Sequence, residues 1–105
     1  MGKKTELLTL LSRHIGRGNG LGVKTLAARL GVDERQARHL VTALREDGHA
    51  VCGTPQDGYY IAATPEELQD TCKFLRARAM HSLVLEAQLR KIPLPDLLGQ
   101  LHLPT

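Results

Sequence analysis

The sequence predicts a mainly α-helical protein with one small β-hairpin, in which a compact N-terminal domain is followed by a long C-terminal helix. Three observations predict this fold class. Apolar residues recur at helical spacing in four segments, and an Asp-Gly pair separates two short strand-like runs. A Thr-Pro-Glu-Glu segment with helix-starting residues follows the second run. The length of 105 residues suits one domain with an appendage, and we expect the boundary between residues 1–63 and 64–105.

The first helix is expected over residues 5–15, where leucines and a final isoleucine form a broad apolar stripe. Gly16 follows this segment and is expected to cap the helix in a left-handed conformation. Glycines then occupy every second position from Gly16 to Gly22, which predicts a flexible connection.

The second and third helices form a closely spaced pair. A short helix is expected over Val23–Leu30, and a longer one over residues 34–47 after Asp33, whose carboxylate can accept a free backbone N–H as N-cap. Four apolar residues of the third helix repeat at the spacing of one helical face. They are Ala37, Leu40, Val41 and Leu44.

The strand-like runs cover residues 49–53 and 59–62, and the Asp-Gly pair in the connection between them is typical of a hairpin turn. A long helix then starts at the Thr64-Pro65 cap and extends to about residue 91. The tail, residues 92–105, is proline-rich at its start and has room for one short turn over residues 96–99. Both Cys52, in an apolar run, and Cys72, on an apolar helix stripe, are expected in the core.

The helix pair has the features of a helix-turn-helix. Leu30-Gly31-Val32-Asp33 gives a sharp turn, and the small Ala37 allows the two helices to pack closely. Such pairs also occur in proteins that never contact DNA, so the pair alone leaves DNA binding and a purely structural role open.

The exposed face of the third helix favours DNA binding, because its side chains suit base edges and phosphates. The hairpin would lie beside it as a wing, although the tip contains no Lys or Arg and Asp57 is repelled by phosphate, so only a weak wing is expected. The alternative is an ordinary solvated helix face. The candidate DNA-binding residues are Lys24, Thr25, Arg35, Gln36, Arg38, His39, Thr42, Arg45, Thr54 and Gln56.

The charge distribution points in the same direction. The chain has a net charge of +3. Residues 1–63 contain nine basic and six acidic side chains, whereas residues 64–105 contain five of each, so the basic excess lies in the N-terminal part. A polyanion is therefore expected to bind there.

Three motifs occur in order: Leu30-Gly31-Val32, Leu44-Arg45-Glu46-Asp47-Gly48 and Pro55-Gln56-Asp57-Gly58-Tyr59. On these motifs, residues 23–61 resemble the winged-helix domain at the N-terminus of the biotin repressor and its relatives among bacterial regulators. With the first helix, the resemblance covers about residues 5–62. It implies a winged helix-turn-helix that binds double-stranded DNA through residues 34–47. No biotin-ligase domain follows, so ligand-controlled repression of that kind is not implied. The chain is also similar to small phage or prophage winged-helix proteins.

The long helix has apolar residues on more than one face, and a lone helix cannot bury them all in a single contact. We expect a homodimer, which suits paired DNA half-sites. The alternative is that this helix folds back over its own domain. The expected dimerisation residues are Leu75, Ala79, Leu83, Val84 and Leu89.

Other classes of function find no support in the sequence. The five histidines are scattered without metal-ligand spacing, no catalytic constellation is present, and no cofactor or small-molecule effector is expected. The MGKKTELL start has no apolar core, so no signal peptide is expected. No membrane span is expected either, and the protein is expected to be cytoplasmic and nucleoid-associated. A transcriptional regulator or phage replication factor is the leading hypothesis. The alternative is a winged-helix adaptor that binds proteins and not DNA. The exposed arginines of the third helix argue against it, because they would gain nothing from contact with a neutral partner.

Overall fold

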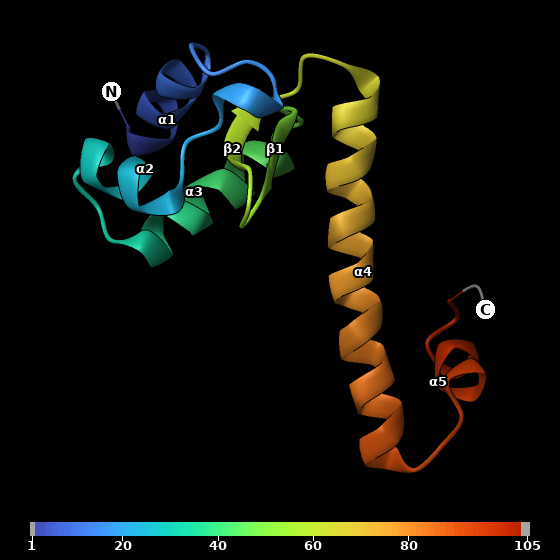
Figure 1. Cartoon of the computed structure of the whole chain (residues 1–105). Coiled ribbons are helices and arrows are strands. Elements are labelled where there is room, and N and C mark those ends of the chain that lie inside the picture. Colours follow the sequence, from blue (N-terminus) through green and yellow to red (C-terminus); the bar gives the residue numbers. More distant parts are fainter. Residues whose placement is uncertain (1, 104–105) are drawn as a thin grey trace. The chain divides into compact units, whose positions relative to one another are not determined.

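The computed structural model describes residues 2–103, which form five α-helices, one 3-10 turn and a two-stranded antiparallel sheet (Figure 1). The predicted mainly helical class with one small hairpin is confirmed. The chain divides into two compact units, the first ending at Thr71 and the second starting at Cys72. The elements are α1 (Lys3–Leu11), η1 (Arg17–Asn19), α2 (Val23–Leu30), α3 (Glu34–Glu46), β1 (Val51–Thr54), β2 (Gly58–Ile61), α4 (Pro65–Arg90) and α5 (Leu94–Gln100).

The core of the first unit is aliphatic and lies among α1, α2 and α3, with the hairpin against it. Each helix contributes residues at helical spacing, so one side of each helix is buried. The fully buried side chains include Leu7 and Leu11 of α1, Leu26 of α2 and Leu44 of α3, each at most 1% exposed. Tyr60 of β2 is also buried. The outer side of α3 is therefore held by a well-packed inner side.

The turn between α2 and α3 is fixed by three local devices. Gly31 has a left-handed conformation (φ +68°), and the N–H of Val32 donates to the carbonyl of Ala27 at 3.0 Å. Asp33 accepts the N–H of Gln36 at 2.7 Å, while its own N–H donates to the Gln36 side chain at 3.2 Å, which completes a capping box. The bounds of α2 match the prediction, and α3 ends one residue before the predicted end.

The hairpin pairs Val51 with Ile61 and Thr54 with Gly58. Gly58 closes the turn at φ +72°, where a Cβ would lie 2.7 Å from the backbone of Leu21. This close approach exists because Leu21 pairs with Tyr59 through two backbone hydrogen bonds of 2.8 and 2.7 Å. The glycine-rich connection from Gly16 to Gly22, which was expected to be flexible, therefore contains η1 and a segment that pairs with β2.

The predicted end of the first helix is wrong. The helix ends at Leu11, and Ile15 instead forms a bridge with Ile61 of β2. The N–H of Ile61 donates to the carbonyl of His14 at 2.9 Å, and the N–H of Gly16 donates to the carbonyl of Ile61 at 2.8 Å. Pairing with β2 thus supplies the backbone hydrogen bonds that a further helical turn would have supplied. Gly16 therefore does not cap α1.

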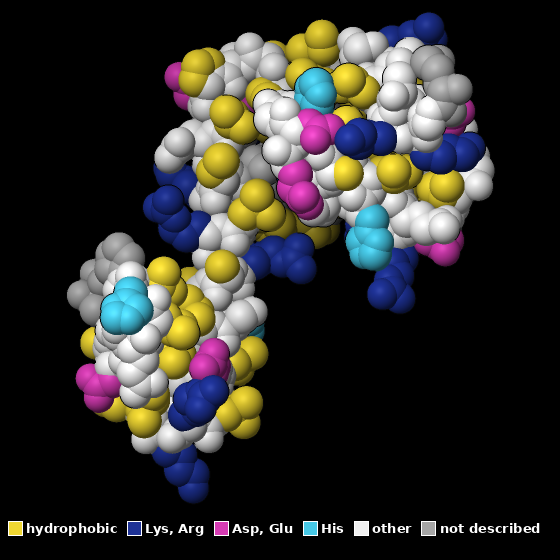
Figure 2. Space-filling model, turned by 180° about the vertical axis from the view of Figure 1, so that it is seen from behind, with side chains coloured by type: hydrophobic (Ala, Val, Ile, Leu, Met, Phe, Trp, Pro, Cys, Tyr) yellow, Lys and Arg dark blue, Asp and Glu magenta, His cyan; other side chains and the backbone are white. Residues whose placement is uncertain are grey.

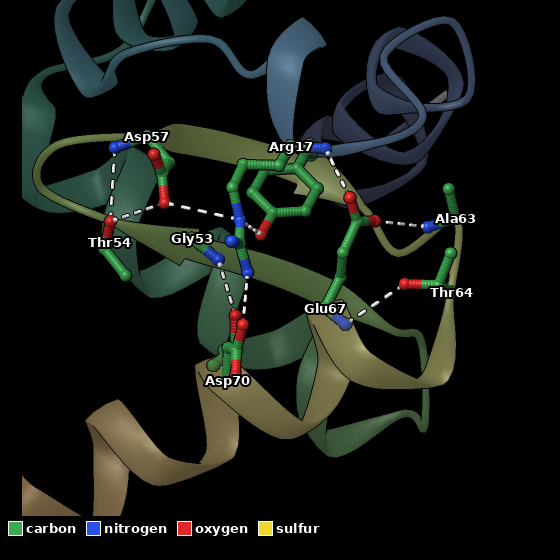
Figure 3. A network of polar contacts seen from close by, with 10 residues as sticks. Arg17, Gly53, Thr54, Asp57, Ala63, Thr64, Glu67 and Asp70 are labelled. Carbon is green, nitrogen blue, oxygen red and sulfur yellow. Dashed lines mark hydrogen bonds and ion pairs between the residues drawn. The ribbon is translucent and has the colours of Figure 1, made fainter.

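The first two turns of α4 belong to the first unit. The hydroxyl of Thr64 accepts the N–H of Glu67 at 3.2 Å, and the Glu67 carboxylate accepts the N–H of Ala63 at 2.8 Å (Figure 3). The buried Thr71 hydroxyl accepts the N–H of Gly53 in β1 at 3.2 Å. The start of α4 is therefore capped as predicted from the Thr-Pro-Glu-Glu segment.

The second unit consists of the rest of α4 and α5, which is longer than the short turn predicted over residues 96–99. Its buried side chains in the described range are Ala87, Leu97 and Leu98. Lys91 ends α4 with a left-handed conformation (φ +57°). The prediction that Cys72 is a core residue is wrong: its side chain is exposed. The residue that α4 buries in this unit, Ala87, lies about 22 Å further along the helix, at a rise of about 1.5 Å per residue. Residues 104 and 105 of the tail lie outside the described residues.

Candidate nucleic-acid interface

The outer side of α3 presents a set of polar and basic side chains that the packed inner side holds in place. The inner residues Ala37, Val41 and Leu44 are at most 1% exposed. The predicted base-contacting residues are all exposed, and all lie in the first three turns of α3. They are Arg35, Gln36, Arg38, His39 and Thr42.

These side chains differ in how far they are already engaged. Arg38 forms a loose ion pair with Glu34 one turn earlier (Nη2–Oε1, 3.6 Å), which is exposed and easily exchanged. The Gln36 carbonyl oxygen is used in the capping box, so its amide N–H₂ group stays available. The Thr42 hydroxyl donates to the Arg38 carbonyl at 3.2 Å, which leaves its methyl group for apolar contact. Within residues 2–103, Arg35 has neither an ion pair nor a side-chain hydrogen bond.

Lys24 and Thr25 occupy the first turn of α2, and both are exposed. Since α2 packs directly on α3, the structure places these two side chains on the element adjacent to the α3 face. An ammonium and a hydroxyl group are of the kinds that bind phosphate oxygens.

Arg45 serves the fold and does not join the exposed α3 face. Its Nε donates to the carbonyl of Val51 at 2.8 Å, and the side chain is half-buried between the end of α3 and β1. Its Nη2 atom is buried and has no hydrogen-bond partner among the described residues. Its position therefore differs from that of Arg35 and Arg38, because the hairpin attracts its guanidinium inward.

The hairpin tip offers little to a ligand. The Thr54 hydroxyl accepts the N–H of Asp57 at 3.1 Å and lies 3.2 Å from the Asp57 carboxylate, so its hydrogen-bonding capacity is used within the turn. Gln56 remains exposed. Asp57 also faces Arg17, whose Nε lies 3.7 Å from it, and this pairing reduces the negative charge at the tip.

Arg17 was not singled out from the sequence, yet it organises a network of polar contacts in the first unit (Figure 3). Its Nη2 lies 2.6 Å from Asp70, and its backbone N–H donates to Glu67 at 2.9 Å. The hydroxyl of Tyr60 and the carboxylate of Asp70 raise the pKa of the Arg17 guanidinium. Its partners lie 40 to 53 residues away in sequence, so no local pattern could have identified it.

Two carboxyl groups near this domain's surface are stabilised in their charged form. The backbone N–H groups of Arg17 and Ala63 lower the pKa of Glu67. A hydrogen bond from the Lys4 ammonium, 2.8 Å away, lowers the pKa of Asp47 at the end of α3. Both acids are thus compensated and exert less repulsion on an approaching anion.

The charge of each compact unit differs from the expected division. The first unit extends to Thr71 and therefore includes Glu66, Glu67 and Asp70. It contains nine basic and nine acidic side chains and has no net charge, whereas the second unit contains five basic and two acidic side chains and carries the whole +3. The basic excess predicted for residues 1–63 disappears when the first two turns of α4, which are acidic, are counted with the first unit.

Residues 2–103 contain no group of three His, Cys, Asp or Glu side chains that could hold a metal ion. No helix in the described part of the chain has both the length and the apolar character needed to cross a membrane. Comparison with protein-family models, curated proteins and solved structures found no match.

Proposed function

We propose that this protein binds double-stranded DNA as a winged helix-turn-helix and reads sequence by placing α3 in the major groove. The observation that carries the proposal is the outer side of α3. Arg35, Gln36, Arg38, His39 and Thr42 project together from a helix whose opposite side is locked into the core. Arginine suits guanine, glutamine suits adenine and a threonine methyl suits thymine.

The hairpin supports the winged-helix interpretation. It follows α3 directly, and Leu21 joins it through two backbone hydrogen bonds, which makes the proposed wing rigid. The wing then contributes shape and backbone contact more than charge, because its tip contains no basic residue. The proposed role is in transcriptional regulation or phage replication, since both need a protein that reads duplex DNA.

We propose further that a second copy of the chain pairs with it along α4. Residues at alternating spacings of three and four form a stripe along α4, called the α4 stripe, and all of its residues except Glu86 are exposed. It is defined as Cys72, Leu75, Ala79, Ser82, Glu86 and Leu89. Leu75 is 40% exposed and Leu89 85% exposed. Such spacing is typical of helices that pair with one another, and small residues allow close approach. Figure 2 shows hydrophobic side chains on the surface of the second unit, at the lower left.

The size of the second unit supports the same proposal. It buries three hydrophobic side chains among its described residues and has fewer than about 40 residues, and units this small usually need a partner, a metal ion or a disulfide in order to fold. Of the predicted dimerisation residues, Leu75, Ala79 and Leu89 lie on the α4 stripe. Leu83 and Val84 are half-buried on the side that bears Ala87 and are better assigned to packing within the unit.

DNA binding is tested by fluorescence anisotropy with random and genomic duplexes. Arg35→Ala and Arg38→Ala should each weaken binding to the preferred sequence by roughly 1–3 kcal/mol. The control is Arg13→Ala, which removes an exposed arginine of the same unit that lies outside α3. Absence of binding by the intact chain at low salt would contradict the proposal.

Dimerisation is tested by sedimentation equilibrium at micromolar concentrations. Leu75→Glu combined with Leu89→Glu should give a monomer, because it places charges in the paired stripe. Leu85→Glu is the matched control, since Leu85 is 46% exposed and lies off the stripe. A strictly monomeric wild-type chain, with and without DNA, contradicts this part of the proposal.

An adaptor that binds only proteins is the alternative, and the neutral charge of the first unit favours it. The two functions are separated by the same titration. An adaptor shows no affinity for duplex DNA at any salt concentration, and its Arg35 and Arg38 variants behave like the wild type.

A further inference from the structure

Three basic side chains occur within six residues of α4, just after Thr71. Lys73, Arg76 and Arg78 span about one and a half turns, and all three are exposed. Together they form the α4 basic segment. They account for three of the five basic residues of the second unit.

The α4 basic segment has no acidic partner in the described part of the chain. The second unit contains two acids, Glu86 and Asp96, and Glu86 is engaged with Arg90 at 2.7 Å. The Arg78 guanidinium lies over the Phe74 ring, 5.8 Å from its centroid. Such a contact orients the guanidinium without neutralising it. Three uncompensated cations within six residues give this part of α4 a positive potential that attracts anions.

We infer that the α4 basic segment binds the phosphate backbone of DNA and supplies most of the electrostatic affinity, while α3 supplies the base contacts. This inference rests on the proposed DNA-binding function. It follows from the charge balance: the first unit, which contains α3, is neutral overall, yet attraction between cations and phosphates dominates the affinity of proteins for DNA. The second unit carries the missing positive charge.

The positions of the three residues around α4 favour DNA over a lipid surface. At 100° per residue, Arg78 lies about 140° from Lys73 and about 160° from Arg76 around the helix. Basic side chains on two flanks of a helix can reach phosphates on either side of it. A helix bound to a membrane surface instead turns an apolar side to the lipid, and the apolar side of α4 is the stripe proposed to pair with a second chain.

The expected size of the effect follows from counterion release. Three phosphate contacts give a slope of roughly −2.7 in a plot of log binding constant against log salt concentration, because each contributes about −0.9. Between about 50 and about 200 mM salt, these contacts alone lower the affinity roughly 40-fold.

The test is a salt titration of the full chain with a random duplex, followed by anisotropy. Lys73→Gln/Arg76→Gln/Arg78→Gln should make the slope shallower by roughly 2–3 and weaken binding to every duplex equally. A charge-preserving variant, Lys73→Arg/Arg76→Lys/Arg78→Lys, should restore the slope. The control Arg90→Gln/Lys91→Gln removes two charges elsewhere in the same unit. For each charge removed, it should change the slope less than the triple Gln variant does. Circular dichroism verifies that α4 is retained in each variant.

The outcomes separate this inference from the proposed function. An unchanged slope in the triple Gln variant, with sequence preference still sensitive to Arg35→Ala, overturns the inference and leaves DNA reading by α3 intact. A shallower slope with no effect of Arg35→Ala supports the α4 basic segment and contradicts reading by α3. Absence of any DNA binding contradicts both. Binding to phosphatidylserine vesicles that is lost in the triple variant, without binding to DNA, assigns the segment to a membrane and overturns the inference.

Discussion

The two compact units of this chain divide core and charge in opposite ways. The first unit buries eleven hydrophobic side chains and has no net charge, whereas the second buries three among its described residues and carries a charge of +3. Stability and attraction for a polyanion thus reside in different parts of the molecule. The first unit has the larger core, whereas both proposed partners, a second chain and the DNA phosphates, would bind the second unit.

The largest expected effect tests the core of the first unit. Leu26→Ala removes a side chain with no exposed surface and should lower the free energy of unfolding by about 2–5 kcal/mol through loss of burial and a residual cavity. Both tyrosines, Tyr59 and Tyr60, lie in this unit and the chain has no tryptophan, so tyrosine fluorescence during urea unfolding reports on it. The exposed neighbour Thr25→Ala should change stability by less than about 0.5 kcal/mol.

The same measurement applied to the second unit sharpens the comparison. Leu97→Ala also removes a buried leucine, but it should leave the tyrosine-monitored transition unchanged, since Leu97 belongs to the other unit. A shift equal to that of Leu26→Ala would mean that the two units unfold as one, and the contrast between them would no longer hold.

The hairpin gives the next effect. Gly58→Ala forces an L-residue into a positive φ, at a cost of about 1–2 kcal/mol, and brings its Cβ within 2.7 Å of the Leu21 backbone. We expect a loss of stability of at least about 2 kcal/mol, since overpacking adds to the strain. Gly18→Ala is the matched control, because a Cβ there meets nothing within 4 Å. Equal stability of the two variants would show that Leu21 does not hold the hairpin.

A smaller effect is expected at the start of α3. Asp33→Ala removes the side chain that accepts the Gln36 N–H and should cost about 1 kcal/mol in urea unfolding. Asp33→Asn keeps an acceptor oxygen and should retain most of the stability. If both variants lose the same amount, the capping hydrogen bond is not what stabilises this end of α3.

The smallest effect is a pH dependence centred on Glu67. Its pKa is lowered from the ordinary 4.5 by the backbone N–H groups of Arg17 and Ala63, so the folded state binds its proton less readily than the unfolded state. The stabilisation is therefore present above about pH 4.5 and is lost as the pH falls through the folded pKa. Glu67→Gln should be less stable than the wild type near neutral pH, and the difference should shrink below about pH 4. A difference independent of pH assigns the effect to geometry and not to charge.

The elements that local patterns specify could be predicted from the sequence. The bounds of α2, the Asp33 cap of α3 and the capped start of α4 follow from apolar spacing and capping residues, which act within one or two turns. The Asp-Gly signal placed the hairpin turn correctly, because Gly58 supplies its positive φ. The outer side of α3 was equally predictable, since burial of Ala37, Val41 and Leu44 determines which side chains face outward.

What could not be predicted depends on contacts between distant segments. Ile15 continues the helical pattern of α1, but pairing with Ile61 ends the helix earlier. Arg45 has a helical position next to the exposed face, yet the carbonyl of Val51 attracts it inward. The apolar spacing around Cys72 suggested a buried side, whereas the side chains buried in the second unit belong to the far end of α4 and to α5. In each case the competing partner lies in a different element, and neither periodicity nor propensity carries that information.

The position of the boundary inside α4 has a consequence for synthesis of the chain. The first unit is complete only when Glu67 and Thr71 have joined it, since their side chains bind the backbone of η1 and β1. When the hairpin has left the ribosome but the start of α4 has not, the first unit therefore lacks the hydrogen bonds to Glu67 and Thr71. Because N-terminal domains fold during synthesis, the first two turns of α4 must leave the ribosome before the first unit can complete its fold.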